Sequence, residues 1–387
     1  MNATDTGSGP LAGVKVLDLS RMYPGAFCTL LLADLGAEVV KVESPGFGDG
    51  LRPMAPPGSF NAAHTALNRG KRSLVLDLRN AAAAEVLAGL VRWADVVVES
   101  HKPGQLDSLG LGYDVMSTAN PRIVWCSLTG FGDTGPNAAA PGHDLTYLGF
   151  SGLLGRLADG PTTPPAAPIA LPATGLMGAV GILAALAQVS RTGKGARLDA
   201  NMVDTAMWTL SEDVARAASA PGPGWGTMSA RNVYVCADGR EVTVASTEPR
   251  TWATLCAALD VPELAGHRFG ADDDAPVTAR LVDAFRSKPA ADWVANPGLA
   301  GGVGPVNDVD DLLGEPQVVE RRSVVPVDGT GARVLANPIR FHGEGGDGAS
   351  HGLTGAPALG ADTDVALLAA GFTADAVAAL RAAGAIV

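Results

Sequence analysis

A glycine-rich run and a histidine–aspartate pair stand close together near the middle of the chain, and both suit chemistry. Residues 130–135 read GFGDTG, and His143 and Asp144 follow shortly afterwards. The run matches GxGxxG, which binds a dinucleotide when it follows the first strand of a βαβ unit and opens a helix. Here it follows a later strand and leads into proline. We therefore favour a glycine-rich active-site loop, in which Gly130 and Gly132 let backbone amides approach a ligand.

Two residues of this chain are candidates for proton transfer. A lone histidine in a loop is usually structural, but His143 follows a glycine-rich turn at the end of a predicted strand, where ligands bind in parallel α/β folds. An imidazole there suits a general base, because it titrates near neutrality. Glu248 follows another predicted strand. The sequence around Glu248 by itself favours a structural role, in which the carboxylate stabilises the start of a helix from Thr251 onward.

Several cations stand near predicted strand ends or turns, in a chain that is short of lysine. Taken singly, each is typical of a solvated surface charge; taken together, they could hold the phosphates of a nucleotide-like ligand. The pattern leaves both interpretations open. These cations are Lys41, Lys71, Arg72 and Lys102.

No motif points to a metal or to several common enzyme classes. The four cysteines are scattered without CxxC spacing, which is typical of reduced thiols in or near a core and makes a metal site improbable. The chain also has no GxSxG elbow, no P-loop and no HExxH. The cysteines are Cys28, Cys126, Cys236 and Cys256.

The elements that must position these residues alternate between short apolar strands and helices. Strand signals within the first 130 residues recur with helical segments between them, which predicts an α/β fold with a parallel, doubly wound sheet. The runs are almost continuously apolar, as expected for strands that are covered on both faces. The predicted strands are 14–19, 37–43, 73–78, 95–99 and 123–128.

The remainder of the chain predicts a second domain. We expect a large domain in residues 1–215, a smaller α+β domain in 216–325 with a hairpin around Asp238 and Gly239, and a C-terminal segment, 326–387, that returns to the large domain. A long alanine-rich helix over 174–189 is apolar all round, so we expect it to be buried.

The composition limits the partners. A net charge of −12 disfavours nucleic acid and anionic membranes, and 47% hydrophobic residues support a large core. The apolar stretches are broken by glycine and charge, and we expect none to reach the roughly 18 residues of a membrane helix. The first ten residues are polar and small, without a secretory signal, so we expect a cytoplasmic protein.

Distinctive segments are spread along almost the whole chain: 9–20 (GPLAGVKVLDLS), 32–43 (LADLGAEVVKVE), 68–78 (NRGKRSLVLDL), 103–104 (PG) with 109–112 (LGLG), 130–136 (GFGDTGP), 181–186 (GILAAL), 192–195 (TGKG) and 199–204 (DANMVD). Together they resemble one family, that of the α-methylacyl-CoA racemases and class III CoA-transferases (CaiB/BaiF-like). The resemblance implies a Rossmann-like large domain, coenzyme A as part of the substrate, and a homodimer of interlocked chains.

The resemblance also assigns roles to individual residues. His143, in the setting PGHDLTY, looks like the base of the racemase branch, and Glu248 matches the glutamate that partners it. The cations Lys41, Arg72 and Lys102 fall where the family binds the adenine and phosphates of coenzyme A.

One departure from the family pattern bears on the reaction. Both branches place an aspartate shortly before the helix that holds GILAAL, but here residues 168–175 read PIALPATG. The aspartate aligns with Leu171, give or take three residues. Without it the usual transferase lacks its nucleophile, and a two-base racemase lacks its second acid/base group.

Three hypotheses follow. The first is a racemase-like enzyme that removes the α-proton of an acyl-CoA through His143, with Glu248 behind it and Asp144 or water in place of the missing acid. The second is a transferase-like enzyme, or a one-base isomerase or lyase, acting on a CoA thioester. The third is a CoA-binding protein without catalysis.

Overall fold

The computed structural model describes residues 9–56, 59–157, 162–219, 226–269, 272–341 and 353–387. The chain divides into two compact units. The first runs to Ser211 and resumes at Glu320, and the second spans Glu212–Val319.

The first unit is built on a six-stranded parallel sheet, with strand order β3-β2-β1-β4-β5-β6. The predicted parallel, doubly wound sheet is thus confirmed. The order reverses between β1 and β4, which neighbour each other although two strands separate them in sequence. Such a switch point is where open α/β sheets bind ligands. The strands are β1 (Lys15–Leu19), β2 (Glu38–Glu43), β3 (Arg72–Val75), β4 (Val96–Glu99), β5 (Val124–Thr129) and β6 (Ala196–Asn201).

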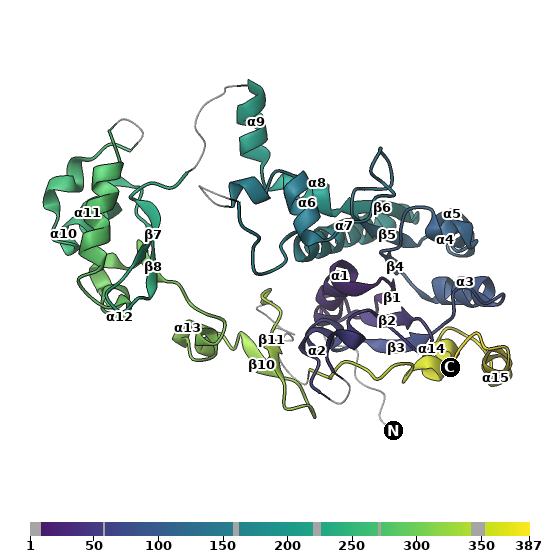
Figure 1. Cartoon of the computed structure of the whole chain (residues 1–387). Helices are drawn as coiled ribbons and strands as arrows, with labels where there is room; N and C mark the ends of the chain where they lie inside the picture. Colours follow the sequence, from purple (N-terminus) through teal and green to yellow (C-terminus); the bar gives the residue numbers. More distant parts are fainter. Residues whose placement is uncertain (1–8, 57–58, 158–161, 220–225, 270–271, 342–352) are drawn as a thin grey trace. The chain divides into compact units, whose positions relative to one another are not determined.

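Helices cover both faces of this sheet (Figure 1). Successive side chains of a strand point to opposite faces, so Leu17 and Val16 of β1 join different core clusters. Leu17 packs in the cluster that includes residues of α3 (Ala83–Trp93), α14 (Thr363–Ala369) and α15 (Ala374–Ala382). Val16 packs in the cluster that includes residues of α1 (Met22–Asp34) and α7 (Ala170–Thr192). The C-terminal segment therefore completes one layer of the first unit.

Glycines allow α1 and α7 to pack closely. A Cβ at Gly175 would lie 2.7 Å from the carbonyl oxygen of Pro24, and one at Gly178 would lie 2.7 Å from the side chain of Leu128. Both glycines lie on the buried stripe of α7, together with Ala179 and Ile182. Residues of this stripe recur every three or four positions, as on one face of a helix.

The opposite face of α7 is exposed, which corrects the expectation of a helix that is buried all round. Leu176, Met177 and Val180 are exposed on it. The estimate that no stretch is long enough to span a membrane was also wrong: α7 is the one helix, among the described residues, that is long and apolar enough to do so. Length and composition alone also fit a helix that packs on a sheet, and α7 contributes its buried stripe to the core of the first unit.

Smaller elements complete the first unit. They are α2 (Ala62–Asn68), α4 (Gln105–Ser108), α5 (Tyr113–Ala119), α6 (Asp144–Phe150), α8 (Met202–Trp208), and the antiparallel pair β10 (Val324–Pro326) and β11 (Arg333–Leu335). Two short helices, α9 (Ser211–Ser219) and α13 (Pro316–Glu320), include the points where the chain passes between units.

The second unit has its own core on a three-stranded antiparallel sheet. The hairpin of β7 (Arg231–Val235) and β8 (Glu241–Ala245) is confirmed, with Gly239 in the left-handed conformation that its turn requires. Trp252 and Phe285 are among its buried side chains. The other elements are β9 (Val303–Pro305), α10 (Pro249–Ala258), α11 (Ala275–Phe285) and α12 (Ala290–Val294).

A fully buried group of charges lies beside β1 in the first unit. The carboxylate of Asp18 has no solvent exposure, and the ammonium groups of Lys41 and Lys71 each lie 3.4 Å from its Oδ2. Lys41 also lies 3.0 Å from Asp49 and donates to the carbonyl of Ser20. Burial by itself favours the neutral amine, but Asp18 and Asp49 raise the pKa of Lys41, whereas burial lowers the pKa of Lys71 to about 8. The group therefore holds charge only because its members compensate one another.

We predict that Lys41→Met lowers the free energy of unfolding by about 3–5 kcal/mol, because it leaves buried carboxylates without their counter-charge. Denaturant unfolding followed by fluorescence measures the change. Lys194→Met, at an exposed lysine, is the control, and we expect it to stay within about 0.5 kcal/mol of the unsubstituted protein. Equal stability of the two variants would contradict this description of the charge group.

Candidate functional site

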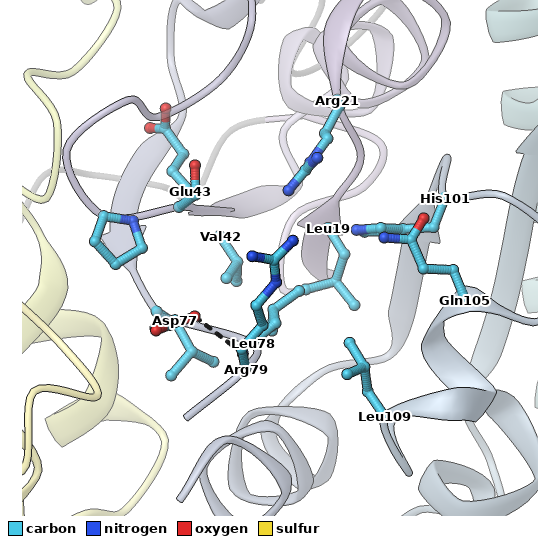
Figure 2. A pocket seen from close by; sticks show the side chains of 13 residues that line it. Leu19, Arg21, Val42, Glu43, Asp77, Leu78, Arg79, His101, Gln105 and Leu109 are labelled. Carbon is cyan, nitrogen blue, oxygen red and sulfur yellow. Dashed lines mark hydrogen bonds between the residues drawn. The ribbon is translucent and has the colours of Figure 1, made fainter. Parts of the chain in front are cut away.

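A cavity of about 370 Å³ opens at the carboxyl edge of the sheet, beside the switch point (Figure 2). Its walls come from the ends of β1 and β2 and from the segments that follow β1, β2, β3 and β4. The size falls within the usual range for small-molecule sites. Six apolar side chains line it: Leu19, Val42, Pro45, Leu76, Leu78 and Leu109.

Two arginines give this cavity its charge. Figure 2 shows the guanidinium groups of Arg21 and Arg79 directed into it. Both residues are exposed, and neither side chain forms an ion pair within the described part of the chain. The carboxylate of Glu43 is already engaged, since Arg52 donates two hydrogen bonds of 2.6 Å to it and Ser73 donates another. The cavity therefore offers free positive charge above an apolar wall.

Polar contacts fix the segments that carry these arginines. Ser20 donates twice to the buried Asp18, through its amide and its hydroxyl, which anchors the turn before Arg21. The amide of Arg21 donates to Ser100 Oγ at 2.8 Å, across the switch point. The amide of Arg79 donates to Asp77, the bond drawn dashed in Figure 2. Both guanidinium groups thus extend from backbone that is held in place.

The histidine–aspartate pair lies at the start of α6. His143 occupies the residue before the helix and is exposed. Tyr147 of α6 is buried against the loop that follows β5, where a Cβ at Gly130 or Gly142 would come within 2.6 Å of its side chain. The ring of Phe131 packs edge-on against the Tyr147 ring, with 5.3 Å between the two ring centroids. The glycines therefore let the loop close on Tyr147, and this packing places His143.

Asp144 connects this pair to α7. Its carboxylate accepts hydrogen bonds from the amides of Ile169, at 3.0 and 3.1 Å, and Leu171, at 2.9 Å. Ile169 caps α7, so Asp144 satisfies free amides at the positive end of that helix. A carboxylate is thus present at the start of α7, although Leu171 itself supplies none.

The glycine-rich run opens no helix, since the next helix begins only at Asp144. Gly132 has φ +91° and donates its amide to Thr129. Asp133 donates its amide to Asp199 and pairs with Arg197 at 2.8 Å. Burial raises the pKa of the Asp133 carboxyl, as does the nearby Asp199. The run is a turn at the carboxyl edge of the sheet, in keeping with the rejection of a dinucleotide fingerprint.

The comparisons with known proteins agree on one family. The model of CoA-transferase family III matches residues 11–363. The chain belongs to CoA-transferase family III. It is 33% identical to the human succinyl-CoA:glutarate CoA-transferase, over 82% of this chain and 76% of that protein. It is 32% identical to the human α-methylacyl-CoA racemase, over 81% and 82% of the two chains.

A solved structure of the family supports the architecture. The CaiB/BaiF family protein from Brucella suis matches with a TM-score of 0.79 and 31% identity, over 92% of this chain and 98% of that one. The family resemblance inferred from the sequence is therefore confirmed. The relatives include both transferases and a racemase, so membership of the family leaves the reaction open.

The structure separates the three cations that the family resemblance groups as phosphate ligands. Lys41 is buried in the charge group and does not reach solvent. Arg72 begins β3 and pairs with Glu38 at 2.6 Å, at the amino edge of the sheet and away from the cavity. Only Lys102 is exposed at the carboxyl edge, after β4. For Lys41 and Arg72 the assignment to phosphate needs correction, because carboxylates already hold both side chains.

The other predicted residues are placed as follows. Glu248 lies in the second unit, where it caps α10 and accepts a hydrogen bond of 3.0 Å from Thr251. Its role as a partner of His143 stays a prediction. Among the described residues, no group of three or more His, Cys, Asp or Glu side chains could hold a metal ion.

The sequence reasoning missed the arginines of the cavity. Arg21 and Arg79 each follow a strand closely, at the ends of β1 and β3. That position was the usable signal, since the carboxyl ends of parallel strands meet at one edge. Lys41 and Arg72 lie within strands instead. The sequence pattern did not distinguish these two positions from positions that follow a strand.

We predict that Gly142→Ala destabilises the first unit by about 1–3 kcal/mol, because its Cβ would lie 2.5 Å from the Tyr147 ring. Denaturant unfolding measures the loss. Gly149→Ala, on the open side of α6, is the matched control and should be neutral or slightly stabilising. In a protein that also carries Tyr147→Ala, we expect Gly142→Ala to cause little further loss of the free energy of unfolding. An unchanged cost in that background would show that the ring is not the obstacle.

Proposed function

We propose that this protein acts on an acyl-CoA thioester and that the cavity beside the switch point holds the nucleotide part of coenzyme A. The observation that carries this proposal is the pair of unpaired arginines, Arg21 and Arg79, above an apolar wall. Guanidinium groups bind phosphates with paired hydrogen bonds, and leucine side chains suit the faces of an adenine ring. Paired guanidinium groups beside leucine side chains therefore suit the phosphates and the adenine of coenzyme A, the ligand expected in a family of CoA-transferases.

We propose proton abstraction next to the thioester carbonyl as the reaction, with His143 as the base. His143 is exposed and lies at the same carboxyl edge of the sheet as the cavity, after β5. An imidazole can accept a proton from the α-carbon near neutral pH. The resulting thioester enolate carries negative charge on oxygen, which amide donors at a helix start stabilise. The helix α6 begins directly after His143. The amides of Thr146 and Tyr147 already donate to the carbonyl of His143, which leaves those of Asp144 and Leu145 as such donors.

Asp144 favours this reaction over covalent transfer. A transferase nucleophile would attack the thioester carbonyl, form an anhydride and release CoA as its thiolate. The described residues at the start of α7 include no other carboxylate, and both oxygens of Asp144 already accept amide hydrogen bonds. Such bonds stabilise the carboxylate charge and lower its nucleophilicity. Asp144 is instead placed to orient the chain between His143 and α7.

CoA transfer is the second candidate, because the human relative at 33% identity is named a succinyl-CoA:glutarate CoA-transferase. Under this alternative Asp144 would exchange its amide contacts for the acyl group. The two reactions differ in what they need: transfer requires an acceptor acid, whereas proton abstraction requires none.

We also propose that the working form is a homodimer, with interlocked chains as in the family resemblance. The support is an exposed apolar surface on the first unit, because soluble monomers rarely leave such area uncovered. Trp208, at the end of α8, is 70% exposed. The surface comprises Leu176, Met177 and Val180 on α7 with Met207 and Trp208 on α8.

Deuterium exchange tests the reaction. The protein is incubated in D₂O with (R)- and (S)-2-methylacyl-CoA, and deuterium and configuration at the α-carbon are followed by mass spectrometry and chiral analysis. We expect exchange, and we expect His143→Ala to slow it by about 10²- to 10⁴-fold, because a general base is lost. Thr146→Ala, on the same helix, is the control and should leave the rate unchanged.

The outcomes separate the hypotheses. Exchange with inversion supports a racemase, and exchange with retention supports a one-base isomerase or lyase. An exchange rate that His143→Ala leaves intact would rule out His143 as the base. CoA transfer from succinyl-CoA to glutarate, abolished by Asp144→Asn and without α-exchange, would favour the transferase.

Light scattering after gel filtration tests the assembly. We expect the mass of two 39.1 kDa chains. We further expect Trp208→Glu to weaken association, because it places a charge in the apolar surface. A stable monomer across micromolar concentrations would contradict the homodimer.

A further inference from the structure

The cavity also holds a histidine beside the two arginines of the proposed function. His101 follows β4 and lines both the main cavity and a small adjoining recess of about 20 Å³. Its side chain is almost completely buried, with 4% exposure. Figure 2 shows its ring directed into the cavity, toward the region that Arg21 and Arg79 also face.

Glu99 determines how this ring is oriented. Its Oε2 accepts a 2.7 Å hydrogen bond from the amide of His101 and lies 3.5 Å from the ring Nδ1. Nδ1 is buried and has no hydrogen-bond partner in this geometry. An ionised carboxylate only accepts, so Nδ1 is favoured to carry the hydrogen. In the neutral ring the distal Nε2 then presents a lone pair to the cavity.

That arrangement suits a phosphate only when the ring is protonated. A phosphate oxygen is an acceptor, like the lone pair of neutral Nε2, and the two repel each other. Protonation converts Nε2 into a charged donor, beside two guanidinium groups that already attract the anion. The carboxylate of Glu99, on the far side of the ring, stabilises the same imidazolium.

The remaining charges around His101 do not reverse this preference. Glu43 is neutralised by Arg52, and Asp133 by Arg197. The charged side chains that line the two cavities with His101 are Glu99 and Lys102 on its own segment, Arg21, Arg79, Glu43 and Asp77 around the main cavity, and Asp107, Asp133 and Arg197 around the recess.

We propose that His101 contacts a phosphate of coenzyme A and takes up a proton when the ligand binds. This inference rests on the proposed CoA site and adds that the affinity of the site depends on pH through one side chain. CoA offers two sources of phosphate, the 3′-phosphate monoester and the pyrophosphate, and both are acceptors for an imidazolium.

Calorimetric titration of the full-length protein with CoA tests the proposal. Each titration is run at pH 6, 7 and 8 in two buffers of different ionisation enthalpy, so that proton uptake is counted directly. Because the ring must carry a proton to donate to the phosphate, we expect proton uptake on binding and an affinity about tenfold weaker at pH 8 than at pH 6. The same titrations are run with dephospho-CoA. This ligand lacks the 3′-phosphate monoester, whose second pKa is near 6, so proton exchange by that group is absent.

Two variants isolate His101. We expect His101→Gln to abolish the protein's share of the proton uptake. With dephospho-CoA, which has no titrating monoester, we expect this variant to bind with nearly the same affinity at pH 6 and pH 8. We expect His101→Lys to bind tightly at both pH values, because its charge persists. Thermal unfolding of both variants confirms that they are folded.

The outcomes are distinct. Uptake with both ligands supports contact with the pyrophosphate, and uptake with CoA alone supports contact with the 3′-phosphate. CoA binding in which His101→Gln retains the pH dependence and proton uptake of the unsubstituted protein would overturn the role of His101 but leave the CoA site standing. Absence of CoA binding at every pH would overturn the site and this inference together.

Discussion

A buried carboxylate on the first strand constrains the rest of this structure. Asp18 lies with no exposure in the centre of the sheet, and an uncompensated charge there would cost several kcal/mol. Compensation comes from Lys41 on β2 and from Lys71 just before β3. Thr29 of α1 and Ser20 add hydrogen bonds. One charge therefore ties together three adjacent strand segments and the first helix.

This constraint reaches the cavity through the turn after β1. Ser20 is bound to Asp18 through two donors, and its carbonyl accepts from Lys41, so the turn has little freedom. Gly25 must be a glycine here, because a Cβ would lie 2.0 Å from the Ser20 side chain. Arg21 follows directly. Arg21 is thus positioned by negative charge in the core, and Lys41 and Lys71 compensate that charge.

The two chemical regions of the first unit share one edge of the sheet but have different supports. Arg21, Arg79 and His101 depend on backbone at the ends of β1, β3 and β4. His143 depends on Tyr147 and on the glycines that allow it to pack. Under the proposed function, the groups expected to bind the nucleotide are independent of those expected to meet the acyl group. Such independence is compatible with a family whose members are named as transferases and as a racemase.

The sequence predicted what depends on local pattern. Apolar runs with helices between them identified the parallel sheet, and Asp238-Gly239 identified a hairpin. The sequence did not predict contacts that depend on which strands become neighbours in the sheet. Lys41 looks like any cation near a strand, and only the pairing of β1 with β2 shows that it faces Asp18. The exposed face of α7 was missed because an alanine-rich helix gives little contrast between its faces.

The contacts of Asp144 were also beyond the sequence. They join residues 25 and 27 positions apart through backbone amides, which carry no sequence signal. The absence of an acid at Leu171 was visible from the sequence, which also offered Asp144 or water in its place, but the amides that Asp144 binds were not visible. Arg21 and Arg79 were predictable, because each follows a strand and the carboxyl ends of parallel strands meet at one edge.

A crystal structure of the protein with bound CoA tests the central claim most directly. We expect the adenine to lie against Leu78 and Leu109 and the phosphate oxygens to lie within hydrogen-bond distance of Arg21 and Arg79. We expect the thiol end to extend along the carboxyl edge of the sheet toward His143. A nucleotide bound at the amino edge beside Arg72, or elsewhere with both arginines left free, would contradict it.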